Sequence, residues 1–238
     1  MAVYHAKDYG PNPNAGVNVN ADHGWGGYAW PRGVPVGLLG TASYRGVTST
    51  VRKELVTLYG LAYAIAREKH GYTIWTKNPN GNGEAWGPWG YENRAISGSS
   101  TPSNHSKGKA NDWNAPFNGY AKGFANIVSD FPPAMVADLE SIGLCWGGRY
   151  GDAMHWEYGY SPADVAGHEA KARKILGGAV PPTTPTAPTE PPKPAPTPDE
   201  DDEKMIARRC NGVDYIWNAG FTFFRRIESK DEYIFDTH

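Results

Sequence analysis

The sequence predicts an α+β fold in which a small antiparallel sheet is flanked by helices, followed by a proline-rich linker and a short β-rich tail. Helical and strand patterns do not alternate regularly along the first 180 residues, which favours α+β over a regularly alternating fold. Glycine (29) and proline (20) are abundant among the 238 residues, as in loop-rich folds and linkers. Nine of the prolines fall in one segment, residues 181–203.

That segment sets the domain organisation. It reads PPTTPTAPTEPPKPAPTPDEDDE, which cannot bury apolar surface, favours extended polyproline II and ends in a self-repelling acidic run. We therefore expect one large domain over residues 1–180, a semi-rigid linker over 181–203 and a small module over 204–238.

Three helices are expected in the large domain. The first has apolar residues at 4-3-4-3 spacing, which lines one helical face: Val51, Leu55, Leu58, Ala62 and Ile65. Thr48 or Ser49 is its expected cap, and Gly71 its expected end. The second is expected from about Pro133 to Ile142, and Gly143 ends it. The third begins at Ser161-Pro162, a capping residue with proline at the first helical position, and ends near Gly177.

Short strands are expected between these helices. Tyr72–Lys77 has the composition of a strand, and two further strands are placed over Lys109–Asn114 and Ala153–Tyr158. On a strand over 109–114, Ala110, Asp112 and Asn114 share one face.

Composition excludes several classes of protein. A formal net charge of −2 argues against a nucleic-acid partner held by bulk charge. The two cysteines, Cys145 and Cys210, form no CxxC pair, so a cysteine zinc site or disulfide scaffold is not expected. No stretch approaches the roughly 20 apolar residues of a membrane-spanning helix, and residues 1–8 lack the apolar run of a secretory signal.

An imidazole and a carboxylate stand seven residues apart at His105 and Asp112. A tight turn at Gly108 would fold His105 back beside Asp112, and one nitrogen and one oxygen ligand on the same side suit zinc. The same segment fits equally well a surface loop with an Asx turn, because such spacing is common by chance.

A second pair, Asp152 and His155, follows a glycine-rich turn. His155 fits a hydrogen-bonded core histidine and Asp152 a turn cap, which are the commoner roles. Alternatively, His155 completes a His-Asp-His ligand set with an open fourth position, as in catalytic zinc sites. Asp152 would then be a free carboxylate close to the metal.

Together the two segments resemble the D-alanyl-D-alanine carboxypeptidase family of zinc peptidases, which includes vancomycin-resistance D,D-peptidases and phage L-alanyl-D-glutamate endopeptidases. The resemblance covers about Thr48 to Tyr158 and rests on the spacing of Ser103-x-His105-x-x-Gly108-x-Ala110-x-Asp112 and Asp152-x-x-His155. The flanking residues also fit: Arg94, Trp146-Gly147-Gly148 and Trp156-Glu157. Trp113 departs from the family, which often has an aliphatic residue there.

The resemblance implies a Hedgehog-like zinc D,D-peptidase fold with Zn²⁺ held by His105, Asp112 and His155. It implies that Asp152 is the catalytic acid/base, where some members have Glu. Arg94 matches an arginine that stabilises the scissile carbonyl or binds a substrate carboxylate.

The implied function is a zinc-dependent peptidoglycan peptidase that hydrolyses an amide bond of the stem peptides, L-Ala-D-Glu or a cross-link. The lack of a signal, the linker and the extra module favour a phage endolysin, a monomer held in the host cytoplasm until lysis and then acting on the wall. A D,D-carboxypeptidase that removes terminal D-alanine is the alternative enzyme. A non-catalytic, zinc-stabilised wall-binding protein is the alternative outside enzymes.

Two regions are left open by the sequence. The tail reads as short strands around an Asn-Ala-Gly turn, and its aromatic and basic residues fit a wall-binding surface, a small β core or an oligomerisation element: Trp217, Phe221, Phe223, Phe224, Arg225 and Arg226. Residues 1–47 either line the site or only wrap the fold.

Overall fold

The structure is a computed structural model that describes residues 2–79, 81 and 83–178, together with the strand segments 206–210, 213–217 and 225–227. The chain divides into two compact units, Met1–Pro188 and Thr189–His238. The linker expected over 181–203 lies outside the described residues, so the domain boundaries stay predictions.

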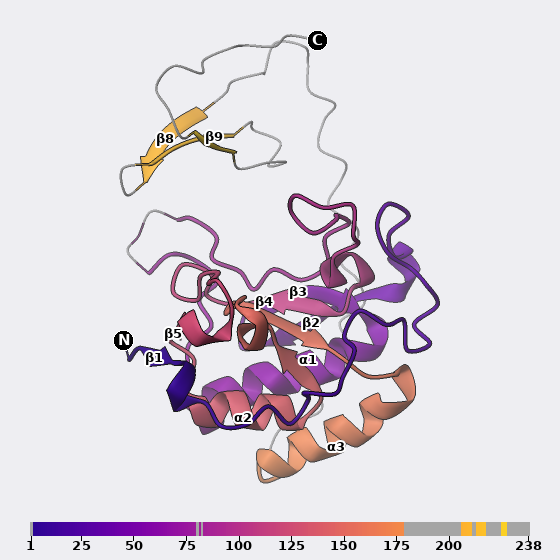
Figure 1. The fold of residues 1–238 in the computed structure, drawn as a ribbon. Coiled ribbons are helices and arrows are strands. Elements are labelled where there is room, and N and C mark those ends of the chain that lie inside the picture. Colours follow the sequence, from indigo (N-terminus) through magenta and orange to yellow (C-terminus); the bar gives the residue numbers. More distant parts are fainter. Residues whose placement is uncertain are drawn as a thin grey trace. The chain divides into compact units, whose positions relative to one another are not determined.

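In the first unit, three helices gather on one side of several short strands (Figure 1). The helices are α1 (Val56–Ala64), α2 (Pro133–Ser141) and α3 (Val165–Ile175). The strands are β1 (Tyr4–His5), β2 (Leu39–Tyr44), β3 (Val47–Arg52), β4 (Ala110–Asp112), β5 (Val128–Ser129), β6 (Leu144–Trp146) and β7 (His155–Tyr158). They pair as β1-β5, β2-β3 and β4-β7-β6, all antiparallel. The α+β class with small antiparallel sheets is therefore confirmed.

The sheet β4-β7-β6 carries the centre of the core. Its register sets Trp146 opposite Trp156, and these rings stack at 6.2 Å between centroids. Trp113 and Phe131 pack against the same layer, with Trp113 5.5 Å and Phe131 5.6 Å from Trp156. Because these aromatic side chains are fully buried, β7 is fixed in position along its length.

The first helix starts later than its apolar spacing predicts. Val51 belongs to β3, and a 3₁₀ turn over Lys53–Leu55 separates that strand from α1. The segment before Lys53 is rich in β-branched residues, which favour a strand, and it pairs with β2 through a turn in which Arg45 and Gly46 both have positive φ. The expected caps at Thr48 and Ser49 are therefore wrong. The helical path continues in a wider turn over Ile65–Lys69 and closes at Gly71 (φ 61°), as expected.

Residues 72–77 do not form the expected strand. Their backbone is held by a side chain instead, because the Asn114 amide accepts a hydrogen bond from Trp75 N at 2.8 Å and donates one to Thr73 O at 2.8 Å. Asn114 itself lies beyond β4 with positive φ (48°), so it does not share a strand face with Ala110 and Asp112 as expected.

The other expected elements are present. Helix α2 begins at Pro133 and ends within one residue of the expected end, with Met135 and Leu139 buried. Ser161 caps a 3₁₀ turn over Pro162–Asp164 that leads into α3. Strands β4 and β7 lie within the expected strands 109–114 and 153–158.

The second unit contains β8 (Ile206–Cys210), β9 (Val213–Trp217) and β10 (Arg225–Ile227), which form an antiparallel sheet in the order β10-β9-β8. The expected Asn-Ala-Gly turn and the phenylalanines 221, 223 and 224 lie outside the described residues. The proposed roles of this tail stay predictions.

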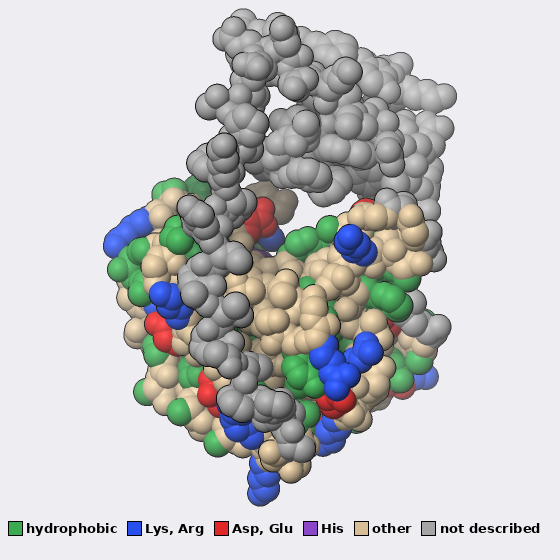
Figure 2. Space-filling view, turned by 180° about the vertical axis from the view of Figure 1, so that it is seen from behind, with side chains coloured by type: hydrophobic (Ala, Val, Ile, Leu, Met, Phe, Trp, Pro, Cys, Tyr) green, Lys and Arg blue, Asp and Glu red, His purple; other side chains and the backbone are tan. Residues whose placement is uncertain are grey.

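On the face shown in Figure 2, basic and acidic side chains of the described residues are interspersed and occur in small groups. This distribution agrees with the near-neutral composition of the chain. Among the described helices, none combines the length and apolar character that a membrane crossing requires.

Candidate metal centre

A capped turn presents His105. Ser103 Oγ accepts a hydrogen bond from His105 N at the start of a 3₁₀ turn over Asn104–Lys107. Gly108 ends the turn in the left-handed region (φ 68°), and a Cβ there would lie 3.2 Å from Arg52 N. The chain therefore reverses at Gly108 into β4, as expected, and His105 lies beside Asp112.

Strand pairing presents the other two side chains. The antiparallel register of β4 and β7 sets Asp112 directly opposite His155. Side chains of directly opposed residues leave the sheet on the same face, so the Asp112 carboxylate and the His155 imidazole meet above it. A local turn and a long-range strand pair thus bring three separated residues together.

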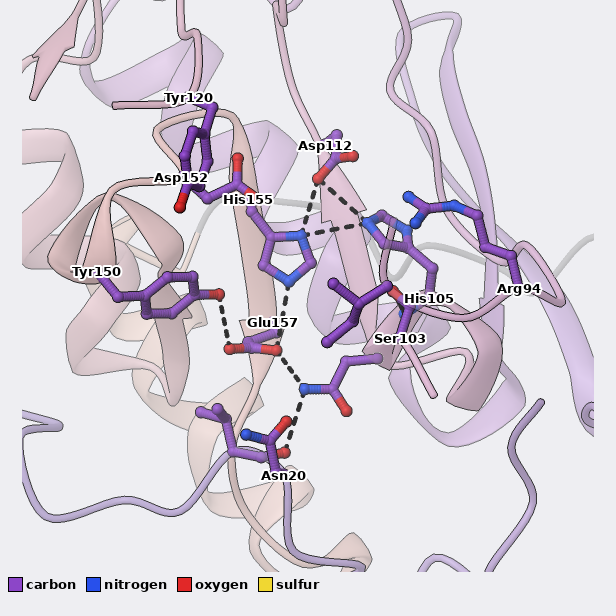
Figure 3. Close-up of a pocket in the computed structure, with 13 residues that line it drawn as sticks. Asn20, Arg94, Ser103, His105, Asp112, Tyr120, Tyr150, Asp152, His155 and Glu157 are labelled. Atoms are coloured by element: carbon purple, nitrogen blue, oxygen red, sulfur yellow. Dashed lines mark hydrogen bonds and ion pairs between the residues drawn. The ribbon is translucent and has the colours of Figure 1, made fainter. Parts of the chain in front are cut away.

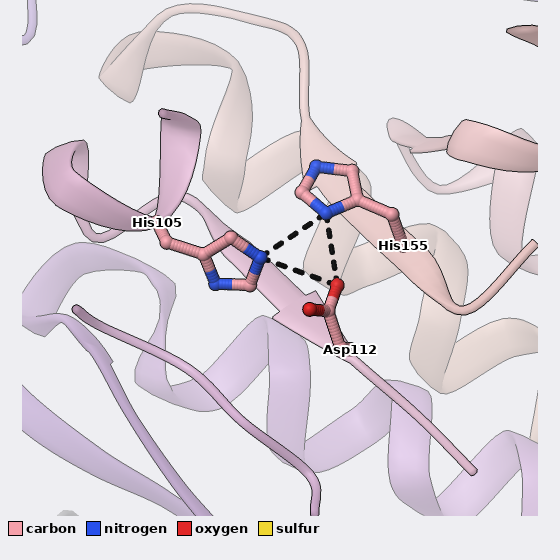
Figure 4. Close-up of side chains that lie close together, drawn as sticks. All are labelled: His105, Asp112 and His155. Carbon is pink, nitrogen blue, oxygen red and sulfur yellow. Dashed lines mark hydrogen bonds and ion pairs between the residues drawn. The ribbon is translucent and has the colours of Figure 1, made fainter. Parts of the chain in front are cut away.

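The three side chains form a compact triangle (Figure 4). His105 Nε2 lies 3.2 Å from Asp112 Oδ1 and 3.2 Å from His155 Nδ1, and the last two atoms are 2.9 Å apart. His105 is 2% exposed and His155 7% exposed. Two ring nitrogens and one carboxylate oxygen therefore face a common point at the edge of the core.

This triangle fits a metal ion. In tetrahedral zinc sites with bonds of about 2.0–2.1 Å, neighbouring ligand atoms lie about 3.3 Å apart, close to the spacing found here. The ring nitrogen of His105 that faces away from the triangle, Nδ1, lies 2.7 Å from Gly90 O. Histidines that ligate metals commonly donate their second N–H in this way, which leaves the facing nitrogen as an electron-pair donor. The residues present suit Zn²⁺.

Gly90 is needed for this contact because the backbone runs close to β3. A Cβ at Gly90 would lie 2.1 Å from Thr50 O. Only glycine lets the two backbones approach so closely, and the approach aims the Gly90 carbonyl at His105.

Electrostatics in the cluster follow from burial and close charges. Burial by itself would raise the pKa of Asp112, but the neighbouring His105 and His155 hold that pKa far below its usual range. Burial would lower the pKa of His155, but hydrogen bonds to the Asp112 and Glu157 carboxylates raise it well above its ordinary value. In the absence of a metal, the cluster therefore pairs an ionised carboxylate with a cationic imidazole.

A cavity of about 380 Å³ opens beside the triangle (Figure 3). Segments from several parts of the chain line it. These residues are Val19, Asn20, Arg94, Ile96, Ser103, Asn104, His105, Asp112, Tyr120, Tyr150, Asp152, His155 and Glu157. The sequence left open whether residues 1–47 line the site. Two of them, Val19 and Asn20, do so.

Asp152 borders this cavity next to His155. Its backbone is fixed by hydrogen bonds from Asp152 N to Gly147 O (2.9 Å) and from His155 N to Asp152 O (3.2 Å). Its side-chain Oδ1 is buried and has no hydrogen-bond partner among the described residues. Burial raises the pKa of Asp152 above its usual value. A buried carboxylate oxygen without a partner is costly for folding alone, so it points to a chemical use.

Arg94 lines the cavity from the opposite side, next to His105 in Figure 3. Its Nε donates to Glu92 Oε2 at 2.7 Å, and its Nη1 donates to Ala95 O at 3.3 Å. The structure therefore brings all five expected site residues to one cavity, but Arg94 is the one that is half-exposed and already paired.

Sequence reasoning missed several residues of the site. The Glu157 side chain lies against His155, and the two-residue period of a strand places both residues on one face. That period is the signal that could have found Glu157. Tyr150 donates to Glu157 from the preceding turn. Tyr120, 77% exposed, lines the cavity beside Asp152, and no local pattern in the sequence signals it.

One comparison with known proteins matches the segment that carries most of the site. Residues 97–158 match the sequence model of a family described as D-alanyl-D-alanine carboxypeptidase, which confirms the resemblance over that segment. This is a family of zinc metallopeptidases, and the matched segment contains His105, Asp112, Asp152 and His155 but not Arg94. No curated protein and no solved structure matches the chain. The expected Hedgehog-like arrangement stays a prediction.

Proposed function

We propose that this chain is a zinc-dependent endopeptidase of the peptidoglycan stem peptide, with L-Ala-D-Glu or a cross-link as the bond that is cut. The observation that carries the proposal is the triangle of His105 Nε2, Asp112 Oδ1 and His155 Nδ1 beside an open cavity and a buried, unpartnered Asp152 oxygen. The family match over 97–158 supports a peptidase that acts on the cell wall.

The three ligand atoms would hold Zn²⁺, which supplies Lewis acidity and can lower the pKa of water to about 7. Asp152 has a free carboxylate oxygen at the cavity wall, and it takes the proton of the attacking water and delivers it to the leaving amine. Its raised pKa brings it closer to the working pH, which suits an acid/base that must change state twice. Arg94 stabilises negative charge on the carbonyl oxygen from the other side.

The setting of Arg94 favours an internal bond over a terminal D-alanine. A D,D-carboxypeptidase must hold the free carboxylate of its substrate. Among the described residues that line the cavity, Arg94 is the one with a Lys or Arg side chain. Glu92 already neutralises it in an ion pair of 2.7 Å. An arginine in that state suits a neutral amide carbonyl better than a carboxylate, so D,D-carboxypeptidase activity is the second candidate.

Mass spectrometry of digested peptidoglycan, with and without a chelator, tests the proposal. The expected result is new amino termini within the stem peptide, lost on chelation and restored by zinc, and absent with His105→Ala, which removes one ligand. Release of free D-alanine alone would make the protein a D,D-carboxypeptidase. Binding to walls without new amino groups would establish a non-catalytic wall-binding protein.

We also propose that the protein works as an endolysin, held in the host cytoplasm until a pore lets it reach the wall. The proline-rich segment 181–203 and the extra module after it support this part of the proposal. Ready lysis of cells that make the protein without any pore would contradict it.

A further inference from the structure

Glu157 is a buried carboxylate that the proposed reaction does not use. It lies two residues after His155 on β7, so both side chains leave the same face of the strand while Trp156 and Tyr158 enter the core on the other. Glu157 is only 2% exposed. A buried carboxylate persists in a fold when surrounding donors satisfy it.

Three donors converge on Glu157 (Figure 3). Asn104 Nδ2 donates to Oε2 at 2.5 Å, Tyr150 OH donates to Oε1 at 3.0 Å, and His155 Nε2 lies 3.3 Å from Oε2. In the described part of the chain, the Glu157 carboxylate forms an ion pair with the His155 ring. Asn104 and Tyr150 thus hold the carboxylate in place, and His155 is the imidazole that it contacts.

We propose that Glu157 is a positioning residue, which sets the tautomer and the angle of the His155 ring so that Nδ1 faces the metal. The inference rests on the proposed zinc site and adds a residue to it. A neutral imidazole carries its proton on one nitrogen only, and the nitrogen that faces a carboxylate is the one that keeps it. The proton then sits on Nε2, and the lone pair of Nδ1 points to Asp112 Oδ1 and His105 Nε2.

The two histidines are oriented in opposite senses. His105 donates a hydrogen bond from Nδ1 to Gly90 O, and its Nε2 faces the other two ligand atoms. In His155 the roles are reversed, because Nδ1 faces the ligand atoms and Nε2–H points to Glu157. A backbone carbonyl is fixed by the fold, but the Glu157 side chain depends on its own anchors. Asn104 is such an anchor, and its amide also donates to Val19 O at 3.3 Å.

Zinc affinity of the full-length protein tests this inference. Competition with a chromophoric chelator should show that Glu157→Gln binds Zn²⁺ 10–100-fold more weakly than the unmodified protein, the usual loss when the carboxylate behind a metal-bound histidine is removed. The matched control is Asp138→Asn, which removes the carboxylate 2.8 Å from His70 Nε2 in a pair outside the cavity lining. The control should bind zinc with unchanged affinity.

An unchanged zinc affinity in Glu157→Gln would overturn the inference and leave the proposed function standing. Failure of the unmodified protein to bind zinc would overturn both. If Glu157→Gln does not fold, ¹⁵N NMR of histidine in the zinc-loaded unmodified protein tests the predicted tautomers directly. The expected spectrum shows the proton on Nε2 of His155 and on Nδ1 of His105, and a proton on Nδ1 of His155 would refute the inference.

Discussion

The two walls of the cavity are built differently. His105, Asp112 and His155 stand on a capped turn and two paired strands above a layer of buried tryptophans. Arg94 and Ile96 come from residues 72–103, whose described part contains isolated bridges but no helix and no named strand. Ile96 is 46% exposed, whereas both histidines are nearly fully buried.

This difference separates two tasks. The proposed metal ligands stand on backbone that the core holds rigid, which suits a task that tolerates errors of only a few tenths of an ångström. The proposed substrate contact, Arg94, stands on a loop, which can adjust to what it binds. We therefore expect substitutions on the strand wall to have larger effects, on chemistry and stability, than substitutions on the loop wall.

The largest effect is expected at Asp152. Asp152→Asn keeps the shape of the side chain but removes the proton acceptor, so kcat should fall by about 10²–10⁴-fold. Zinc content should stay the same, because Asp152 is not among the three ligand residues. Metal analysis alongside single-turnover hydrolysis checks both points. A variant that retains most of its activity would remove Asp152 from the reaction.

A smaller effect, on stability, is expected at Lys109, a fully buried residue next to β4. Burial lowers its pKa from 10.5 to about 8. Below pH 8 the folded protein carries this buried charge. Between pH 8 and 10.5 the unfolded chain keeps a proton that the folded chain has released, so rising pH favours folding. Lys109→Met should be more stable by about 3 kcal/mol below pH 8, and the difference should vanish towards pH 10.5.

Urea unfolding of both proteins from pH 7 to 10.5 measures that difference. Tyr63 is common to both proteins, so its titration cancels in the difference. The titrations of Cys145 and Lys109 influence each other, so the comparison is made in a Cys145→Ala background. A gap that stays constant across this range would show that Lys109 carries no buried charge.

The smallest effect is expected at Arg94. It is half-exposed and paired with Glu92, so solvent and its partner screen its charge. Arg94→Gln should lower kcat, and with it kcat/KM, by roughly 10-fold, about 1 kcal/mol, because the arginine acts on charge that develops on the carbonyl oxygen. Zinc affinity should be unchanged. Arg45→Gln is a matched control, since Arg45 forms an exposed ion pair with Glu68 at 3.1 Å away from this cavity. An equal loss in both variants would show that Arg94 does not stabilise the charge on the carbonyl oxygen.

The same contrast explains which parts of the molecule the sequence predicted. The convergence of His105 and Asp112 follows from a short motif in which one glycine reverses the chain, and that geometry is local. Helices α2 and α3 carry their own start signals in Pro133 and Ser161. Such features need no knowledge of distant residues.

The errors arose where distant groups decide the structure. Val51 matched a helical spacing by chance, but pairing with β2 placed it in a strand. Residues 72–77 have the composition of a strand, but the Asn114 amide supplies the hydrogen bonds that a neighbouring strand would have given. Tyr120 reaches the cavity because its backbone bridges to Asp152, and nothing near Tyr120 in the sequence signals that bridge.

The buried tryptophan layer also limits how far the protein can be shortened. Residues 97–158, which carry the family match, leave out the Gly90 carbonyl that steers one imidazole and the Val19 carbonyl that binds Asn104. They also leave out α1, whose buried Tyr63 ring packs against Trp113. A fragment trimmed to the matched boundaries would keep all three proposed ligands but expose apolar side chains of the core to water. A shortened chain that keeps the site must therefore begin before Val19.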